Sequence, residues 1–274
     1  MKIFCIGNGT SRKGFDLETL RGKGKIYGCN GLYRDFKPDV LISVDNGIMH
    51  EVYQSGLAKE IPCYFRNWTR VPAGHYEMML YAGLSLAEAE NVKKEWDGLY
   101  ENDRGNATEF VMHGSNLQGV VNIMRRNKTT YKESINKHYG YVSWIYDGDK
   151  SHSLSDLDEK KDRGWAAGPT SGFVATKVED VSEMYLIGHD LVSDTQKVNN
   201  LYAGTKHYVP IEQGPTPHVN WVNQWSQLFM WNPKIKFYKV NSGDGKTSQP
   251  ISEWDKHQNL EYIDYPRLAK LAGL

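Results

Sequence analysis

The chain has 274 residues, and 33 lysine and arginine residues balance 33 aspartate and glutamate residues, so it carries no overall basic field for nucleic acid. This length allows one large α/β domain with a full hydrophobic core. The three cysteines show no C-x-x-C spacing and are too few for a disulfide framework. We expect a cytoplasmic protein without a signal peptide or a membrane-spanning segment.

The first eleven residues predict a ligand-binding turn. Residues 3–6 are apolar and partly β-branched, which favours a short strand buried on both faces. Two glycines around an asparagine follow, where the backbone can turn sharply and a ligand can approach its N–H groups. The third glycine of a dinucleotide motif is missing, so we interpret this turn as a mononucleotide-type loop. Roughly half of all Gly-X-Gly turns after a strand are plain chain reversals. The residues predicted to bind the ligand here are Gly7, Asn8, Gly9, Thr10 and Ser11.

The next two strands end in polar residues as well. Residues 25–30 end at Asn30, and residues 39–45 end at Asp45 before a helical stretch over residues 48–57. The carboxyl ends of parallel strands lie along one edge of a sheet. We therefore expect Asn8, Asn30 and Asp45 to converge on one pocket.

The middle of the chain continues the alternation of strands and helices. We expect a helical turn at residues 15–20, strands at residues 63–66, 108–113 and 139–146, and helices at residues 78–96 and 117–126. Arg125, Arg126 and Lys128 form a basic cluster at the end of the last helix, where cations commonly serve as helix caps.

The sequence Asp147-Gly148-Asp149 has two interpretations. Two carboxylates at this spacing can hold a divalent ion on a sugar diphosphate, and Asp-Gly between apolar segments is also a common turn signal, which we favour. Residues 150–163 are charged and rich in serine, and predict a mobile loop. We expect lids around residues 147–165 and 192–218.

The second half of the chain supplies further candidates. Thr170, Ser171 and Gly172 open a predicted helix, and a core strand over residues 184–188 leads to Asp190. The loop over residues 199–208 has no hydrophobic period, yet it carries chemically active side chains, as functional loops do. Its candidates are Tyr202, Lys206, His207 and Tyr208, and His218 precedes an aromatic helix at residues 219–231.

These elements predict an α/β fold of Rossmann-like type, with a mostly parallel sheet and helices on both faces. We expect residues 1–240 to form the nucleotide-binding domain, with a strand at residues 234–240. Residues 241–274 would form a C-terminal extension packed on it, ending in a short strand and a small helix.

The motifs at residues 7–11, 29–33, 170–172 and 185–190, in this order, resemble the family-42 bacterial sialyltransferases and their relatives among bacteriophage-type glycosyltransferases. The similarity spans residues 1–240 as scattered motifs. A pterin diphosphokinase-like family shares the opening motif. Gly168 and Pro169 stand where the sialyltransferases have an arginine before the Thr-Ser-Gly motif, and Thr10 stands where proline is usual. A phage-encoded enzyme would act in the host cytoplasm.

The resemblance implies a role for each candidate. Asn8 and Asn30 would hold the ribose and phosphate of the donor nucleotide, and Thr170, Ser171 and Gly172 would line its base and phosphate. Asp190 would contact the sugar or orient the loop. His218 matches the general base and His207 a neighbouring histidine. Tyr202 or Tyr208, with Lys206 beside them, would stabilise the departing phosphate.

We therefore expect a glycosyltransferase that moves a sugar from a CMP- or UDP-sugar to a hydroxyl of a glycan or another acceptor. It would require no cofactor, with Mg²⁺ or Mn²⁺ held by Asp147, Asp149 or Asp45 as an open alternative. Three other functions stay open. They are an ATP-dependent diphosphokinase with a metal on Asp45 and Asp190, glycosylation of a nucleic-acid base beside the basic cluster, and a non-catalytic nucleotide-binding protein. Whether the protein forms an oligomer also stays open.

Overall fold

The computed structural model describes residues 1–75, 87, 104–113, 141–158, 162–191, 193, 196–242 and 250–274. The helices predicted at residues 78–96 and 117–126, and the basic cluster of Arg125, Arg126 and Lys128, lie outside the described residues.

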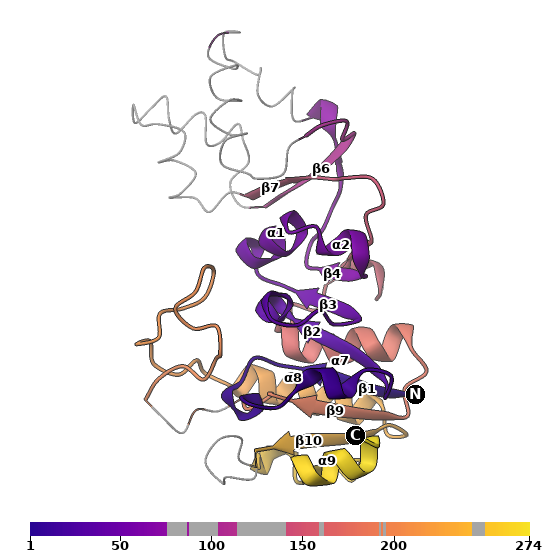
Figure 1. The fold of residues 1–274 in the computed structure, drawn as a ribbon, viewed down its shortest axis with the longest axis vertical. Coiled ribbons are helices and arrows are strands. Elements are labelled where there is room, and N and C mark those ends of the chain that lie inside the picture. The colour runs from indigo at the N-terminus through magenta and orange to yellow at the C-terminus, as the bar shows by residue number, and fades with distance from the viewer. Residues whose placement is uncertain are drawn as a thin grey trace.

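An eight-stranded sheet in which every pairing is parallel forms the centre of the fold, as the α/β prediction requires (Figure 1). Its order is β11-β10-β9-β1-β2-β3-β4-β8, so the chain builds outward from β1 in one direction and then returns to β1's other side with β9. Such a reversal leaves a crevice at the carboxyl ends of the central strands. The strands are β1 (Lys2–Ile6), β2 (Lys25–Cys29), β3 (Val40–Ser43), β4 (Cys63–Phe65), β8 (Ser151–Ser153), β9 (Glu183–Ile187), β10 (Lys236–Asn241) and β11 (Leu260–Asp264).

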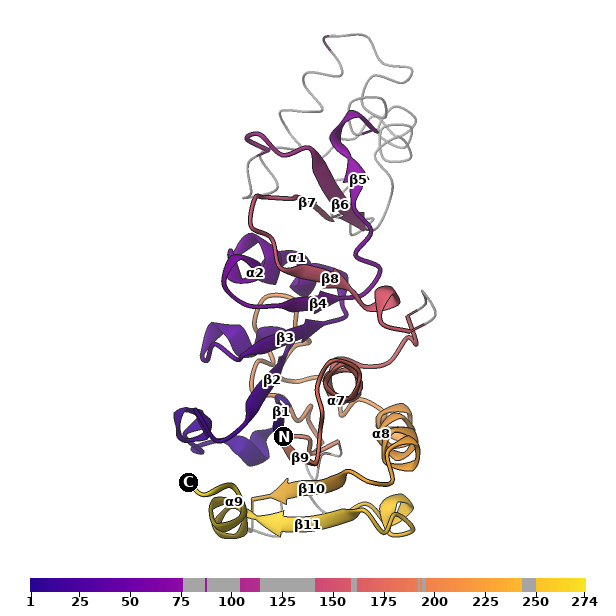
Figure 2. The same ribbon diagram turned by 90° about the vertical axis from the view of Figure 1, so that its right-hand side faces the viewer.

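Alternate residues of each strand enter two hydrophobic layers, because successive side chains point to opposite faces of a sheet. Ile3 and Cys5 of β1 pack with the layer under α7 (Ala167–Val178) and α8 (Val219–Trp231). Phe4 and Ile6 pack with the layer on the opposite face, which also contains Leu268 of α9 (Tyr265–Ala272). Figure 2 shows α7 and α8 on one face, and α1 (Asn46–Gln54), α2 (Leu57–Glu60) and α9 on the other. The prediction of helices on both faces is confirmed.

A second, antiparallel sheet lies beyond α1 and consists of β5 (Val71–Pro72), β6 (Glu109–His113) and β7 (Tyr141–Trp144). It is joined to the main sheet through α1, where His50 Nδ1 and Ser143 Oγ lie 2.7 Å apart. The stacked rings of Tyr53 and Tyr146, with centroids 4.5 Å apart, extend this contact.

Four segments differ from the sequence prediction. The helical turn expected at residues 15–20 is the 3₁₀ helix η2 (Leu17–Leu20), and two more 3₁₀ helices, η1 (Thr10–Arg12) and η3 (Asn30–Arg34), follow β1 and β2. Part of the loop expected at residues 150–163 forms β8 and η4 (Leu154–Asp156), because Trp68 Nε1 donates to Ser151 Oγ and Leu154 is buried.

The C-terminal residues contribute the edge strand β11 to the main sheet. β11 pairs with β10 in parallel register, preceded by the 3₁₀ helix η5 (Ser252–Trp254). Trp254 is fully buried, and its Nε1 donates to the carbonyl of Val222 in α8 at 3.0 Å. Among the described residues, no helix is long and apolar enough to cross a membrane.

Candidate functional site

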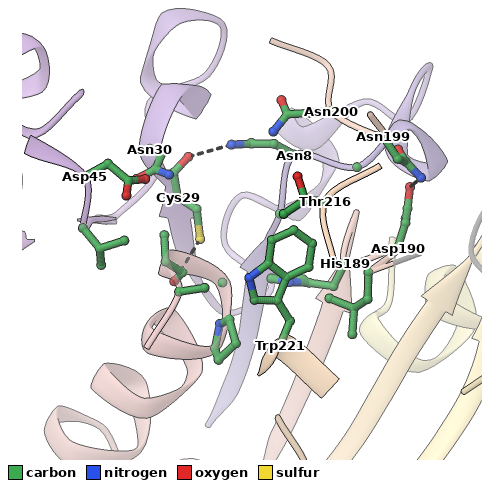
Figure 3. A pocket seen from close by; sticks show the side chains of 18 of the residues that line it. Asn8, Cys29, Asn30, Asp45, His189, Asp190, Asn199, Asn200, Thr216 and Trp221 are labelled. Atoms are coloured by element: carbon green, nitrogen blue, oxygen red, sulfur yellow. Dashed lines mark hydrogen bonds between the residues drawn. The ribbon is translucent and has the colours of Figure 1, made fainter. Parts of the chain in front are cut away.

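A cavity of about 500 Å³ opens at the carboxyl edge of the main sheet, where the strand order reverses (Figure 3). The loops after β1, β2, β3 and β9 form its floor, and the first turns of α7 and α8 with residues 198–216 form its walls. Of the predicted site residues, those that line it are Gly7, Asn8, Gly9, Asn30, Asp45, Asp190, His207 and Tyr208. The predicted convergence of Asn8, Asn30 and Asp45 is therefore confirmed.

The glycines of the opening motif allow two strand tips to approach each other. A Cβ atom on Gly7 would lie 2.5 Å from the carbonyl oxygen of Gly188, and one on Gly9 would lie 2.4 Å from Asp190 Oδ2. The N–H groups of Gly7 and Gly9 donate to the carbonyls of Ile187 and Gly188, each at 2.8 Å. The space that the sequence assigned to a ligand is thus filled by the loop after β9.

Asp190 organises this loop from the inside. Its carboxylate is buried and accepts hydrogen bonds from the backbone N–H of Ser11 at 2.9 Å, from the Ser11 hydroxyl, and from Asn199 Nδ2 at 3.0 Å. Asn199 Oδ1 in turn accepts from the backbone N–H and hydroxyl of Thr10, at 2.8 and 2.9 Å. Thr10, Ser11 and Asp190 therefore bind protein groups, and Thr10 and Ser11 do not line the cavity.

Asn8 and Tyr208 present polar atoms to the cavity. Asn8 Nδ2 donates to the carbonyl of Cys29 at 3.2 Å and to the Tyr208 hydroxyl at 3.4 Å, whereas Asn8 Oδ1 is buried without a hydrogen-bond partner among the described residues. The Tyr208 hydroxyl also accepts from the backbone N–H of Gly31 at 2.7 Å. Because this oxygen accepts from two donors, its own proton remains available to a ligand. Burial raises the pKa of Tyr208, so that proton is retained.

Asn30 and Asp45 lie at the tips of β2 and β3, next to each other in Figure 3. Asn30 takes up the left-handed backbone conformation, with φ +47°, and its Oδ1 accepts from Ser43 Oγ at 2.9 Å, which fixes the orientation of the amide. Asp45 is exposed to solvent at the cavity, yet the surrounding protein raises the pKa of its carboxyl, against the opposing effect of Arg66.

The Thr-Ser-Gly motif lies inside α7, below the cavity. Thr170 Oγ1 donates to the carbonyl of Trp165 at 3.3 Å, and Ser171 Oγ donates to that of Gly168 at 2.6 Å. A Cβ atom on Gly172 would lie 2.7 Å from side-chain atoms of Trp225 and Leu228 in α8. The three residues therefore pack α7 against its neighbours. The cavity is lined instead by the first turn of the helix, namely Ala167, Gly168 and Pro169.

His189, which the sequence analysis did not select, lies in the cavity floor behind Trp221 (Figure 3). Its side chain is buried, its ring meets Trp225 edge to face at 5.1 Å, and its Nε2 has no hydrogen-bond partner among the described residues. Burial lowers the pKa of this imidazole from 6.5 to about 3, with a smaller effect from the positive charge of Lys239. The ring is therefore neutral at neutral pH.

Three of the predicted catalytic residues do not line the cavity. The hydroxyl of Tyr202 donates to Asp35 Oδ2 at 2.6 Å and accepts from Arg12 Nη2 at 3.2 Å, and burial raises its pKa to about 12. Lys206 is exposed. His218 immediately precedes α8, as expected, and is partly buried.

The Asp147-Gly148-Asp149 motif forms a turn between β7 and β8 and does not line the cavity. Gly148 has φ +75°, and Asp149 accepts from the backbone N–H of Ser151 at 2.9 Å and its hydroxyl at 2.8 Å, and pairs with Arg70. The turn interpretation is confirmed. Among the described residues, no three His, Cys, Asp or Glu side chains form a group that could hold a metal ion.

Several cavity residues were missed because the sequence gives little signal for them. Trp221 lies in a helix where aromatic residues are frequent, and two of them, Trp225 and Phe229, are core residues. Gln224, one turn further, accepts from the backbone N–H of Ala166 at 3.0 Å and so connects α8 to the start of α7. The missed polar lining also includes Arg66, Ser193, Asn199, Asn200, Thr216 and Asn220.

Comparison of the chain with sequence models of protein families, with curated proteins and with solved structures finds no match.

Proposed function

We propose that the protein is a glycosyltransferase that binds a nucleotide-activated sugar in the cavity and transfers the sugar to an acceptor hydroxyl. The observation that carries this proposal is the convergence, in one cavity of about 500 Å³, of two strand-tip asparagines, a helix N-terminus, a tyrosine hydroxyl and a histidine. The volume is in the range of cavities that enclose small molecules. The position at the switch point of a parallel sheet is typical of nucleotide sites.

The donor's phosphate would bind at the first turn of α7, beside Tyr208. The first N–H groups of a helix lack partners within the helix and attract anions. The Tyr208 proton, which the protein leaves available, would hydrogen-bond to the phosphate as negative charge develops on it. Tyr208 rather than Tyr202 is assigned this role because the Tyr202 hydroxyl donates to Asp35.

The rest of the donor would bind between the strand tips and α8. Asn8 Oδ1 needs a donor, which a ribose hydroxyl or a base amino group would supply. Trp221 offers an aromatic face at the cavity wall, and such faces stack on bases and sugars. Asp45, at the exposed end, would accept from sugar hydroxyls.

His207 would serve as the general base, because it lines the cavity whereas His218 does not. Burial lowers its pKa, against the opposite effect of Glu51, so the imidazole is unprotonated at neutral pH and can accept a proton. It would remove the proton of the acceptor hydroxyl while the sugar leaves the nucleotide phosphate.

The contacts of Asp190 favour a transferase over a diphosphokinase. The diphosphokinase would need Asp190 and Asp45 to hold a metal ion, but the Asp190 carboxylate already accepts hydrogen bonds from Ser11 and Asn199. Asp45 alone would hold the metal ion poorly, since divalent ions such as Mg²⁺ take several oxygen ligands.

The experiment is a panel of CMP, UDP, GDP and ATP with and without Mg²⁺, read by calorimetry. One of the pyrimidine nucleotides should bind, and Asn8→Ala should weaken its affinity about tenfold. Asp147→Asn, at the remote turn, is the matched control and should leave affinity unchanged. The corresponding nucleotide-sugar should release nucleotide only with wild-type protein and variants that keep His207. Binding of ATP alone, with release of AMP, would replace the proposal with the diphosphokinase.

A further inference from the structure

The two carboxylate oxygens of Glu51 in α1 differ: among the described residues, one accepts hydrogen bonds and the other has no donor. Its Oε1 accepts from the Tyr33 hydroxyl at 2.7 Å, from Arg34 Nε at 2.9 Å and from Arg34 Nη2 at 2.5 Å. Its Oε2 is buried and has no hydrogen-bond partner among the described residues. A buried carboxylate oxygen without a donor is costly, which indicates that this oxygen has a use.

The imidazole of His207 lies close to that oxygen, with its Nε2 3.5 Å from Glu51 Oε2. The ring lies along one face of α1, because Gly47 and Glu51 are four residues apart and therefore adjacent on the helix surface. A Cβ atom on Gly47 would lie 2.4 Å from His207 Nδ1, so only glycine leaves room for the ring. His207 itself has φ +65°, an uncommon conformation for a residue with a side chain.

The loop that carries His207 is held by Arg34, the arginine that pairs with Glu51. Arg34 Nη1 donates to Thr205 Oγ1 at 2.7 Å, and Arg34 Nη2 donates to the carbonyl of Lys206 at 2.9 Å. Arg34 thus bridges Glu51 and the two residues before His207. The side chains of His207 and Glu51 are 18% and 16% exposed, so the pair is shielded from water while the ring still reaches the cavity.

We propose that Glu51 is the positioning residue of His207: Glu51 Oε2 accepts the Nε2–H of the imidazole and so leaves the lone pair on Nδ1 for the acceptor hydroxyl. This inference rests on the proposed function. A carboxylate on one ring nitrogen fixes which nitrogen carries the proton in the neutral imidazole. Glu51 does not line the cavity and never touches substrate.

In the transfer step, the acceptor O–H bond breaks and its proton moves to His207 Nδ1. The acceptor oxygen forms a bond to the anomeric carbon of the sugar, and the bond from that carbon to the phosphate oxygen breaks, with its electron pair leaving on the nucleotide. Glu51 remains ionised throughout and stabilises the imidazolium that forms, a role that a buried carboxylate performs well.

The charges around the ring are consistent with this role. Burial lowers the pKa of His207, Glu51 raises it, and Lys206 and Arg34 lower it. His50, on the next turn of α1, is fully buried with a pKa well below normal, so it adds no charge at neutral pH. The ring of Tyr141 meets that of His207 edge to face at 5.9 Å, and the Tyr141 hydroxyl lies on the same side of Gly47 as His207 Nδ1. Glu51 is thus the one negative charge among these neighbours.

The test is ¹⁵N NMR of protein labelled at histidine nitrogens, with His207 assigned from the spectrum of His207→Gln. We expect wild-type His207 to be the Nε2–H form, with Nδ1 unprotonated. Glu51→Gln should lower the pKa of His207, and Glu60→Gln, an exposed glutamate on α2, is the matched control. An Nδ1–H form in the wild type would overturn the inference, even if Glu51→Gln failed to fold.

Kinetics separates positioning from a structural role. Glu51→Gln should lower kcat at least about tenfold with little change in the donor KM, and should move the acid limb of the pH profile to lower pH. An unchanged kcat and pH profile in folded Glu51→Gln would overturn the inference. If the wild type transfers sugar from no donor, the proposed function fails, while the NMR measurement still decides how the ring is held.

Discussion

On one side of the cavity, the tips of β1 and β9 are joined to each other by hydrogen bonds, whereas on the side of β2 and β3, Asp45 and Tyr208 present polar groups to the cavity. The first group, here the β1–β9 side, comprises Gly7, Gly9, Ser11, Asp190 and Asn199. Gly7 and Gly9 donate to the carbonyls of Ile187 and Gly188, and Asp190 accepts from Ser11 and Asn199. The second, the β2–β3 side, comprises Asn30, Asp45, Glu51, His207 and Tyr208. Among the described residues it contains a buried carboxylate oxygen without a hydrogen-bond partner, and a hydroxyl that accepts from two donors.

This difference shows that a motif at a strand tip can stabilise the fold. The Gly-Asn-Gly-Thr-Ser sequence builds a rigid crossing of two loops, and only Asn8 in it turns an unsatisfied atom toward the cavity. Substitutions on the β1–β9 side should therefore change stability, and those on the β2–β3 side should change binding and turnover.

The largest effect is expected for Asp190→Ala. Removal of a buried carboxylate leaves the donors of Ser11 and Asn199 unsatisfied, which should lower the free energy of unfolding by about 3 kcal/mol. Urea denaturation measures this loss. Asp45→Ala, a carboxylate of the β2–β3 side that is exposed, is the control and should change stability by less than about 0.5 kcal/mol. Equal losses in the two variants would contradict the division.

The second prediction compares two histidines. His207→Ala should lower the turnover number about a hundredfold or more, because it removes the proposed base, while His218→Ala should change it less than about threefold. Nucleotide release under saturating donor measures both. A large loss of turnover in His218→Ala with none in His207→Ala would identify His218 as the general base, as the sequence resemblance implied. The loop before α8 would then have to move into the cavity.

The third prediction concerns pH and the buried His189. Its pKa is about 3 in the folded protein and 6.5 in the unfolded chain, so the unfolded state binds the extra proton between these values. Stability is therefore complete above pH 6.5 and is lost as the pH falls, by about 2 kcal/mol between pH 6.5 and 5. His189→Gln should remove that part of the pH dependence. Parallel stability curves for the two proteins would show that His189 is protonated in the folded state.

The role of a residue can be predicted from the sequence when it follows from the topology of the sheet, but not when it depends on tertiary contacts. Asn8, Asn30 and Asp45 could be brought together in advance, because the carboxyl ends of parallel strands share an edge. The roles of Thr10, Ser11 and Asp190 could not, because the same polar residues can face a ligand or one another. Only the close approach of the loops after β1 and β9 shows that these residues face one another and not a ligand.

Other features have no local signal at all. Glu51 and His207 are 156 residues apart and meet only because the loop folds back onto α1. The strand β8 has the sequence Ser-His-Ser, without the apolar character that identifies buried strands, because it forms an edge of the sheet. The Thr-Ser-Gly motif was predicted to open its helix, but α7 begins at Ala167, so Thr170 and Ser171 lie inside the helix and do not cap it. Their burial could not be predicted from the sequence.

The smallest effect should come from a single hydroxyl, and two tyrosines allow a matched test. Tyr208→Phe removes an oxygen that lies at the cavity between Asn8 and the N–H of Gly31, so it should weaken nucleotide binding about fivefold to tenfold, the value of one neutral hydrogen bond. Tyr202→Phe removes an oxygen bound to Asp35 and Arg12, so it should lower the melting temperature and leave nucleotide affinity unchanged. Calorimetry and thermal unfolding of both variants measure these effects. If Tyr202→Phe alone weakened binding, the phosphate would have to lie on the Arg12 side of the loop, outside the cavity.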